Sequence, residues 1–241
     1  NSSRFGKFME IIFDNRNTAM SGCNITSYLL EKSRVTTVLN GERSYHIFYQ
    51  LIAGTRENNV KGLNFMDGVT ASDFNYLSAN GEVAETGSGM ADGDEVSFLM
   101  DAMKRLRFTE RAQRSMFEVV AGVMYCGNID IVADESAGGW ATVSSETKSR
   151  EAISRVSSLL GLDAAELETA LCTQTLHIGG DVTVKRLLPL SARENRDALA
   201  KAVYSALFDF ILAHLNKFMI SLDGSSGEEE KQGEFKANDD G

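Results

Sequence analysis

The first seven residues place phosphate-binding groups directly ahead of a short apolar run. The segment Asn1–Lys7 (NSSRFGK) combines an amide, two hydroxyls, a guanidinium and a glycine, and residues 8–13 (FMEIIF) are rich in aromatic and β-branched types. One serine hydroxyl can ligate Mg²⁺, its neighbour can reach a terminal phosphate or the attacking water, and the arginine can tie the loop to a distant carboxylate. A loop followed by a strand predicts an α/β nucleotide site, although Asn and Ser also build turns and helix caps that bind no ligand.

Four further segments follow this loop at compatible spacings. They are residues 27–35 (SYLLEKSRV), 42–51 (ERSYHIFYQL), 108–129 (FTERAQRSMFEVVAGVMYCGNI) and 196–212 (RDALAKAVYSALFDFIL). Together with the opening loop they resemble the myosin motor domain over roughly residues 1–219. The resemblance implies a mainly α fold with a few strands. It would be part of the α/β P-loop motor, namely the upper 50-kDa subdomain plus one strand of a central sheet whose other strands lie outside this chain.

The domain division follows from the same resemblance and from composition. We expect residues 1–222 to form a partial motor domain and residues 223–241, acidic and rich in Gly, Ser and Glu, to be a disordered tail or insertion. The chain begins within the loop motif and without a methionine, so we also expect an N-terminal part to precede it.

The opening loop is similar to switch I, which in this family closes over the γ-phosphate and Mg²⁺. By this resemblance Asn1, Ser2, Ser3 and Gly6 line the nucleotide site, and Ser3 ligates the Mg²⁺ that accompanies ATP. Ser2 would lie between the terminal phosphate and the lytic water, and Arg4 would pair with a glutamate of switch II in the closed site. Ser2 and Arg4 are therefore the expected catalytic residues. The loop is expected to be ordered when the terminal phosphate is bound and disordered when it is absent.

Two parts of the nucleotide site are missing from the sequence. No Walker A pattern G-x-x-x-x-G-K-[ST] occurs, since Gly6-Lys7 is followed by Phe8, and the switch II sequence of the family is absent. We expect the chain alone neither to bind ATP tightly nor to hydrolyse it. In the intact parent motor the resemblance implies an actin-activated ATPase.

Residues 173–187 resemble the cardiomyopathy loop, an actin-contacting element of the family. Asp181 lies sixteen residues before Asp197, where the family requires an acidic or phosphorylatable residue. Its carboxylate implies actin binding that needs no heavy-chain phosphorylation at this position, while Asp beside Gly also favours a simple turn. Lys185 and Arg186 are further candidate contacts to acidic actin.

Composition limits the remaining partners. A net charge of −10 disfavours nucleic acid, and no uninterrupted apolar run approaches the ~18–20 residues of a membrane span. Cys23, Cys126 and Cys172 have no metal-binding spacing and are expected to be buried thiols of a reducing cytosol. The expected partners are the actin filament, ATP and the rest of the heavy chain, with light chains or calmodulin bound outside this chain. The expected location is the cytoplasmic actin cytoskeleton.

Apolar periodicity predicts helices in the first half of the chain. One begins near Tyr45 with Gly54 as its C-terminal cap, and His46 on it is expected to pack in the core. A second passes through Val96 to Leu106, and a third starts after the N-cap Thr109 and ends before Gly127. The Gly-rich, acidic residues 80–93 indicate a surface loop.

In the second half, residues 138–150 are polar and indicate turns. A following helix ends at Gly161, and Asp163 opens a short helix. Residues 175–187 predict a projecting two-stranded hairpin or a loop around Gly179-Gly180, and a long helix covers about residues 193–216.

Two other functions are open at this point. The chain could be a non-catalytic actin- or protein-binding module from a truncated myosin-like gene, which stop codons near both ends of the coding sequence would favour. It could also be another P-loop nucleotidase with a convergent switch, but that class predicts no helix of the DALAK type, and residues 197–201 carry one.

Overall fold

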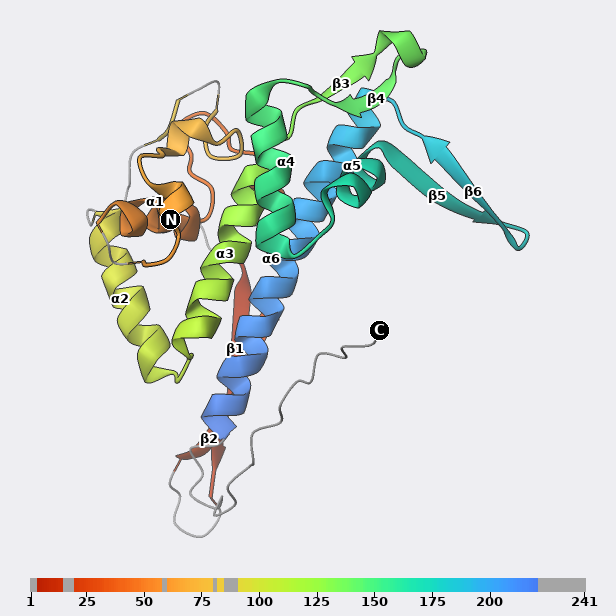
Figure 1. Cartoon of the computed structure of the whole chain (residues 1–241). Coiled ribbons are helices and arrows are strands. Elements are labelled where there is room, and N and C mark those ends of the chain that lie inside the picture. Colours follow the sequence, from red (N-terminus) through yellow and green to blue (C-terminus); the bar gives the residue numbers. More distant parts are fainter. Residues whose placement is uncertain (1–3, 15–19, 58–59, 80–81, 85–90, 221–241) are drawn as a thin grey trace, which may run out of the picture.

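The computed structural model describes residues 4–14, 20–57, 60–79, 82–84 and 91–220 (Figure 1). Its helices are α1 (His46–Arg56), α2 (Asp92–Arg105), α3 (Glu110–Cys126), α4 (Thr147–Leu160), α5 (Ala164–Cys172) and α6 (Pro189–Ile220). Its strands are β1 (Gly6–Phe13), β2 (Met20–Tyr28), β3 (Ile131–Asp134), β4 (Trp140–Val143), β5 (Thr173–Ile178) and β6 (Asp181–Arg186). Short 3-10 helices are η1 (Lys32–Val35), η2 (Asn64–Met66), η3 (Ala71–Asp73) and η4 (Glu135–Ala137). The prediction of a mainly α chain with a few strands is confirmed, whereas residues 223–241 lie outside the described residues.

The described strands form three separate antiparallel pairs. Strand β1 pairs with β2 from Gly6 opposite Tyr28, with an irregularity after Ile12, and the other pairs are β3 with β4 and β5 with β6. The strand predicted at residues 8–13 is confirmed as β1, but β2 was not predicted. The assignment of residues 138–150 to turns is wrong, because β4 and the start of α4 lie there.

The core lies between helices packed around α3. Helix α3 contacts α4, α6 and α1, and α6 runs beside it through the centre of the molecule (Figure 1). The predicted start of α3 is confirmed, since the Thr109 hydroxyl accepts from the amide of Ala112 at 3.2 Å. Phe117, Val123 and Met124 are almost fully buried, which is why this helix anchors the others.

Helix α1 corrects one cap and one burial prediction. Gly54 does not end the helix, which continues to Arg56. A Cβ at Gly54 would lie 2.9 Å from Val60 Cγ2 and 3.1 Å from Val96 Cγ2, so the missing side chain lets α2 approach α1 closely. His46, expected in the core, is exposed at the first turn.

Helix α6 begins earlier and ends later than predicted. Pro189 occupies its first position, where a missing amide hydrogen costs nothing, and the helix runs to Ile220. By length and composition alone its Pro189–Met219 portion could cross a bilayer, with a mean hydropathy of 1.4 in its most apolar window, which the sequence analysis did not anticipate. That is weak evidence, because core helices of soluble proteins meet the same criterion, and α6 here contacts β2, α3 and α5.

Candidate functional site

Arg4 lies at the start of β1 and is held by the segment that follows β2. Its Nη1 donates to Glu31 Oε2 at 3.1 Å, and its carbonyl accepts from the amide of Glu31 at 3.0 Å. The Arg4 side chain keeps 30% of its surface exposed. The first described residue of the candidate switch I loop is therefore fixed on one side and open to solvent on the other.

Glu31 is shared between two arginines. Arg34 Nε donates to Glu31 Oε2 at 3.0 Å, and Arg34 Nη1 donates to Glu42 Oε2 at 2.6 Å. The hydrogen bond from Arg34, followed by that from Arg4, holds the pKa of the Glu31 carboxyl below its ordinary value. Arg34 is buried, with 9% of its side chain exposed, so it is the centre of this cluster and Arg4 is its outer member.

The predicted nucleotide-site residues are only partly visible. Asn1, Ser2 and Ser3 lie outside the described residues. Gly6 opens β1 in an exposed position, and a Cβ there would meet Tyr28 at an ordinary 3.7 Å, so packing does not require glycine. Arg4, which the resemblance paired with a carboxylate of switch II, pairs with Glu31 in this chain. Sequence reasoning missed that pair because 27 positions separate its members.

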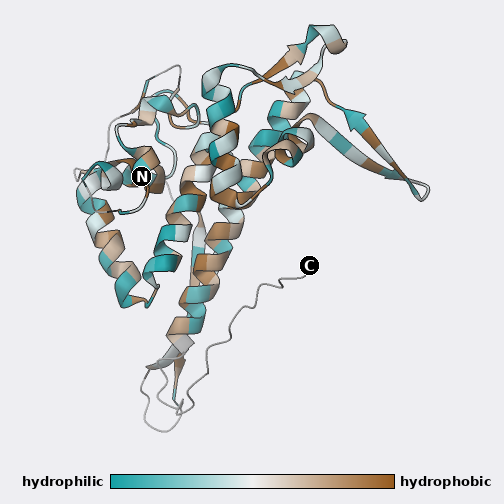
Figure 2. Ribbon diagram, in the orientation of Figure 1, coloured by the Kyte–Doolittle hydropathy of each residue, from teal (hydrophilic) through white to brown (hydrophobic). Residues whose placement is uncertain are grey.

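Strand β1 exposes apolar side chains on both of its faces. Phe8 is 54% exposed and Met9 50%, although successive side chains of a strand point to opposite faces. Its partner β2 packs on α6, where the Asn216 side chain bonds both backbone groups of Ile25, accepting from its amide at 2.7 Å and donating to its carbonyl at 2.9 Å. Hydrophobic residues also continue along the C-terminal half of α6 (Figure 2), where Phe210 is 53% exposed.

The β5–β6 hairpin projects away from the helices (Figure 1). Gly179 and Gly180 both have positive φ, at 61° and 96°, which is the backbone of a tight two-residue hairpin turn and confirms the predicted hairpin. All six residues of β6 are exposed, including Val182 and Val184. Exposed apolar side chains on a projecting hairpin are typical of a partner-binding element.

The three predicted actin contacts lie at two places on this hairpin. Asp181 is at the tip, opposite Ile178, whereas Lys185 and Arg186 are at the root, opposite Gln174 and Thr173. At ~3.4 Å per residue the tip and root are ~15 Å apart, so they cannot bind the same group. Because strand neighbours alternate, Lys185 and Arg186 also face opposite sides, and Arg186 lines a cavity beside Trp140.

Asp197, the residue sixteen positions after Asp181, has a structural role. Its Oδ1 accepts from the Tyr76 hydroxyl at 2.5 Å and from Arg196 Nη2 at 2.8 Å. Burial raises the pKa of Tyr76, so the hydroxyl is a donor throughout the ordinary pH range. Arg196 Nη1 also donates to the carbonyl of Ile129 at 2.9 Å, and this network fixes α6 to the end of α3.

Metal and thiol chemistry finds little support among the described residues. No group of three or more His, Cys, Asp or Glu side chains there could hold a metal ion. The three cysteines are free and buried as predicted, and burial raises the pKa of Cys126 to about 12. Cys126 is therefore an inert core residue.

Comparison with known proteins identifies the family. Residues 1–229 match the model of the myosin head (motor domain) family. The chain is similar to unconventional myosin-Ia of Mus musculus, with 39% identity over 96% of this chain and 21% of the relative. It is also similar to unconventional myosin IC of Drosophila melanogaster (38% identity, 90% of this chain, 20% of the relative) and to the myosin ID heavy chain of Dictyostelium discoideum (37%, 90% and 19%).

The chain belongs to the myosin motor-domain family, and the resemblance read from its sequence is confirmed. It spans about a fifth of the length of the curated relatives it matches.

Proposed function

We propose that this chain is the switch I and upper 50-kDa portion of an actin-based motor that couples Mg-ATP hydrolysis to actin binding. The observation that carries the proposal is the family match over residues 1–229, which includes the opening loop, the projecting hairpin and the long helix. The motor works in the cytoplasm on the actin cytoskeleton, with light chains or calmodulin bound outside this chain.

The nucleotide part of the proposal rests on the opening loop. Asn1, Ser2, Ser3 and Gly6 contact the nucleotide, and Ser3 supplies a hydroxyl to Mg²⁺. Ser2 positions the lytic water, and Arg4 stabilises the closed loop. The bound Mg²⁺ supplies charge neutralisation for phosphoryl transfer to water. Since Arg4 already bonds Glu31, closure exchanges this exposed ion pair for one within the closed site.

Strand β1 supports the location of this loop at the edge of a larger sheet. Its apolar residues on both faces are what a strand of a sheet covered on both sides requires. In the complete motor, a strand from outside this chain pairs with the free edge of β1, and other elements cover its two faces. Strand β1 then transmits the state of the opening loop to α6 through β2.

The actin part rests on the β5–β6 hairpin. Asp181 at its tip and Lys185 at its root are exposed, carry opposite charges and share one face of β6, whereas the exposed Val182 and Val184 lie on the other face. This arrangement suits a contact with a mixed polar and apolar surface. Arg186 adds a second cation on the opposite side of the root.

The test is ATP turnover by the complete protein with and without actin filaments, together with co-sedimentation on filaments. A motor of this class is expected to turn over ATP faster with actin and to leave the filaments when ATP is added. Filament binding without any effect of ATP on release or turnover would instead establish a non-catalytic binding module.

A further inference from the structure

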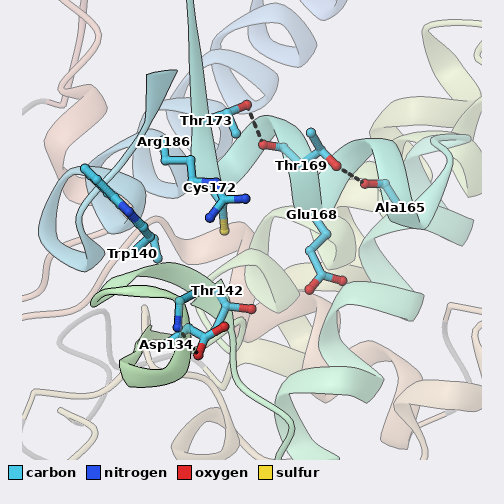
Figure 3. Close-up of a pocket in the computed structure, with 11 residues that line it drawn as sticks. Asp134, Trp140, Thr142, Ala165, Glu168, Thr169, Cys172, Thr173 and Arg186 are labelled. Carbon is cyan, nitrogen blue, oxygen red and sulfur yellow. Dashed lines mark hydrogen bonds between the residues drawn. The ribbon is translucent and has the colours of Figure 1, made fainter. Parts of the chain in front are cut away.

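A cavity of about 450 Å³ lies at the root of the β5–β6 hairpin, between β4, α5 and the end of β6. Its volume falls in the ~300–1,000 Å³ range of small-molecule sites. The side chains that line it include Asp134, Trp140, Thr142, Glu168, Cys172 and Arg186 (Figure 3). It shares no residue with the opening loop.

The indole of Trp140 forms an aromatic wall of this cavity. Trp140 begins β4 and remains 36% exposed, and its indole N–H makes no hydrogen bond to any described residue. Figure 3 shows Trp140 and Arg186 on the same side, with Glu168 across the cavity. A flat ring can therefore lie against the indole and gain stacking contact.

The charge balance of the lining leaves one cation available. Glu168 is already bound by Arg150, whose Nη1 and Nη2 donate to its two oxygens at 2.8 and 3.1 Å. Asp134 Oδ1 accepts from the Ser136 hydroxyl at 2.6 Å and from two backbone amides. The Arg186 side chain makes no hydrogen bond or ion pair with any residue in the described ranges, so its guanidinium can bind a ligand.

The two carboxylates limit the charge of that ligand. The bonds from Ser136, and further the charge of Arg186, hold the pKa of Asp134 below its ordinary value, so Asp134 is ionised at neutral pH. Like charges repel, so two anionic groups on the lining disfavour a polyphosphate and tolerate a single negative charge beside Arg186.

We propose that this cavity binds a small aromatic monocarboxylate, with the ring against Trp140 and the carboxylate on Arg186. The site shares Arg186 with the actin contacts proposed above and shares no residue with the proposed nucleotide contacts. Because the cavity is lined by the root of the hairpin, an occupied site restrains β6 relative to α5.

The chain provides its own reporter for this site. Trp140 is its single tryptophan, so the intrinsic tryptophan fluorescence of the 241-residue chain comes from the wall of the cavity. The probe is para-nitrobenzoate, a nitroaromatic quencher, titrated through the millimolar range. The uncharged para-nitrobenzamide, matched in shape, controls for collisional quenching, and both titrations are corrected for absorbance.

The expected result is saturable quenching by the carboxylate and only linear quenching by the amide. Arg186→Gln should weaken the saturable component about tenfold or more, because a charge-assisted hydrogen bond is lost. Lys185→Gln removes the same charge from the other face of β6 and should leave the curve unchanged. Asp134→Asn keeps the helix cap, removes a repelling charge and should tighten binding.

Equal quenching by acid and amide would overturn the proposal. An Arg186→Gln quenching curve that matches the wild type would also overturn it, and so would an equal loss of affinity in Lys185→Gln. Either result would show that the quenching does not depend on the Arg186 guanidinium. Circular dichroism on each variant verifies that the exposed substitutions leave the fold intact.

Discussion

The helical body and the β1–β2 hairpin use apolar residues in opposite ways. Around α3, Phe117 and Met124 are 2% and 0% exposed, whereas on β1 Phe8 and Phe13 are 54% and 57% exposed. The body has a core of its own within this chain, and the hairpin does not. We therefore infer that the stability of this chain resides in its helices, and we propose that other parts of the motor cover β1.

The largest expected effect comes from a matched pair of truncations in the two regions. Phe117→Ala should lower the free energy of unfolding by about 3–5 kcal/mol, because it opens a cavity in the core. Phe8→Ala should change it by less than about 0.5 kcal/mol, because the ring is already exposed. Urea unfolding of the 241-residue chain measures both. A loss of several kcal/mol for Phe8→Ala would show that Phe8 is packed within this chain, and would contradict the difference between β1 and the helical body.

A second test sharpens the description of the body at the end of α3. A Cβ at Gly127 would lie 2.7–2.9 Å from three ring atoms of Tyr76, which is itself 3% exposed and cannot move aside. Gly127→Ala should therefore cost about 1–3 kcal/mol in urea unfolding. The control is Gly122→Ala, where the nearest atom is Leu160 Cδ2 at 3.0 Å, the end of a flexible side chain. An equal or larger loss in the control would refute this steric explanation.

A smaller effect is expected from the polar contact that joins α6 to this region. Tyr76→Phe removes the hydroxyl that donates to Asp197 and leaves the ring in place. The expected loss is about 1–2 kcal/mol, since Asp197 keeps its bonds from Arg196. Thermal unfolding measures it, with Tyr204→Phe as a control. The Tyr204 ring stacks on Tyr45, and its hydroxyl makes no hydrogen bond to any residue that the structure describes. Equal losses in both variants would remove the special role of the Asp197 bond.

The smallest change in the free energy of unfolding is expected at Glu31, where the β1–β2 hairpin joins the helical body. The folded-state pKa of Glu31 is lowered, so its pairing stabilises the chain above its unfolded pKa of 4.5 and this contribution is lost as the pH falls through the lower folded value. Glu31→Gln should cost less than about 1 kcal/mol at neutral pH, because the carboxylate is 38% exposed and screened. Urea midpoints of both proteins should converge as the pH falls through the folded-state pKa of Glu31. A difference independent of pH would contradict the ionic origin.

Sequence reasoning succeeded where the signal was local. The start of α3 needs only the Thr109 cap and the apolar period behind it, and the stop of α4 needs only Gly161, whose φ is +67°. The hairpin turn at Gly179-Gly180 is equally local. These features depend on residues within one or two turns of the chain.

Sequence reasoning failed where tertiary contacts decide. Gly54 has the composition of a helix cap, but its role is to admit Val60 and Val96, which only the packing of α1 against α2 defines. Strand β4 was missed because polar residues surround Trp140–Val143 and its partner β3 fixes it. For the same reason no local pattern indicated the Arg4–Glu31 pair or the cavity beside Trp140.

The most direct measurement of the central claim is actin-activated ATP turnover of the complete protein carrying Arg4→Ala, with Glu31→Gln as the matched variant. If Arg4 acts on the closed nucleotide site, Arg4→Ala abolishes actin activation while nucleotide still binds. Glu31→Gln retains turnover, because it breaks only the ion pair between Arg4 and Glu31. Wild-type turnover in Arg4→Ala, or equal losses in both variants, would show that this arginine is structural and would contradict the account.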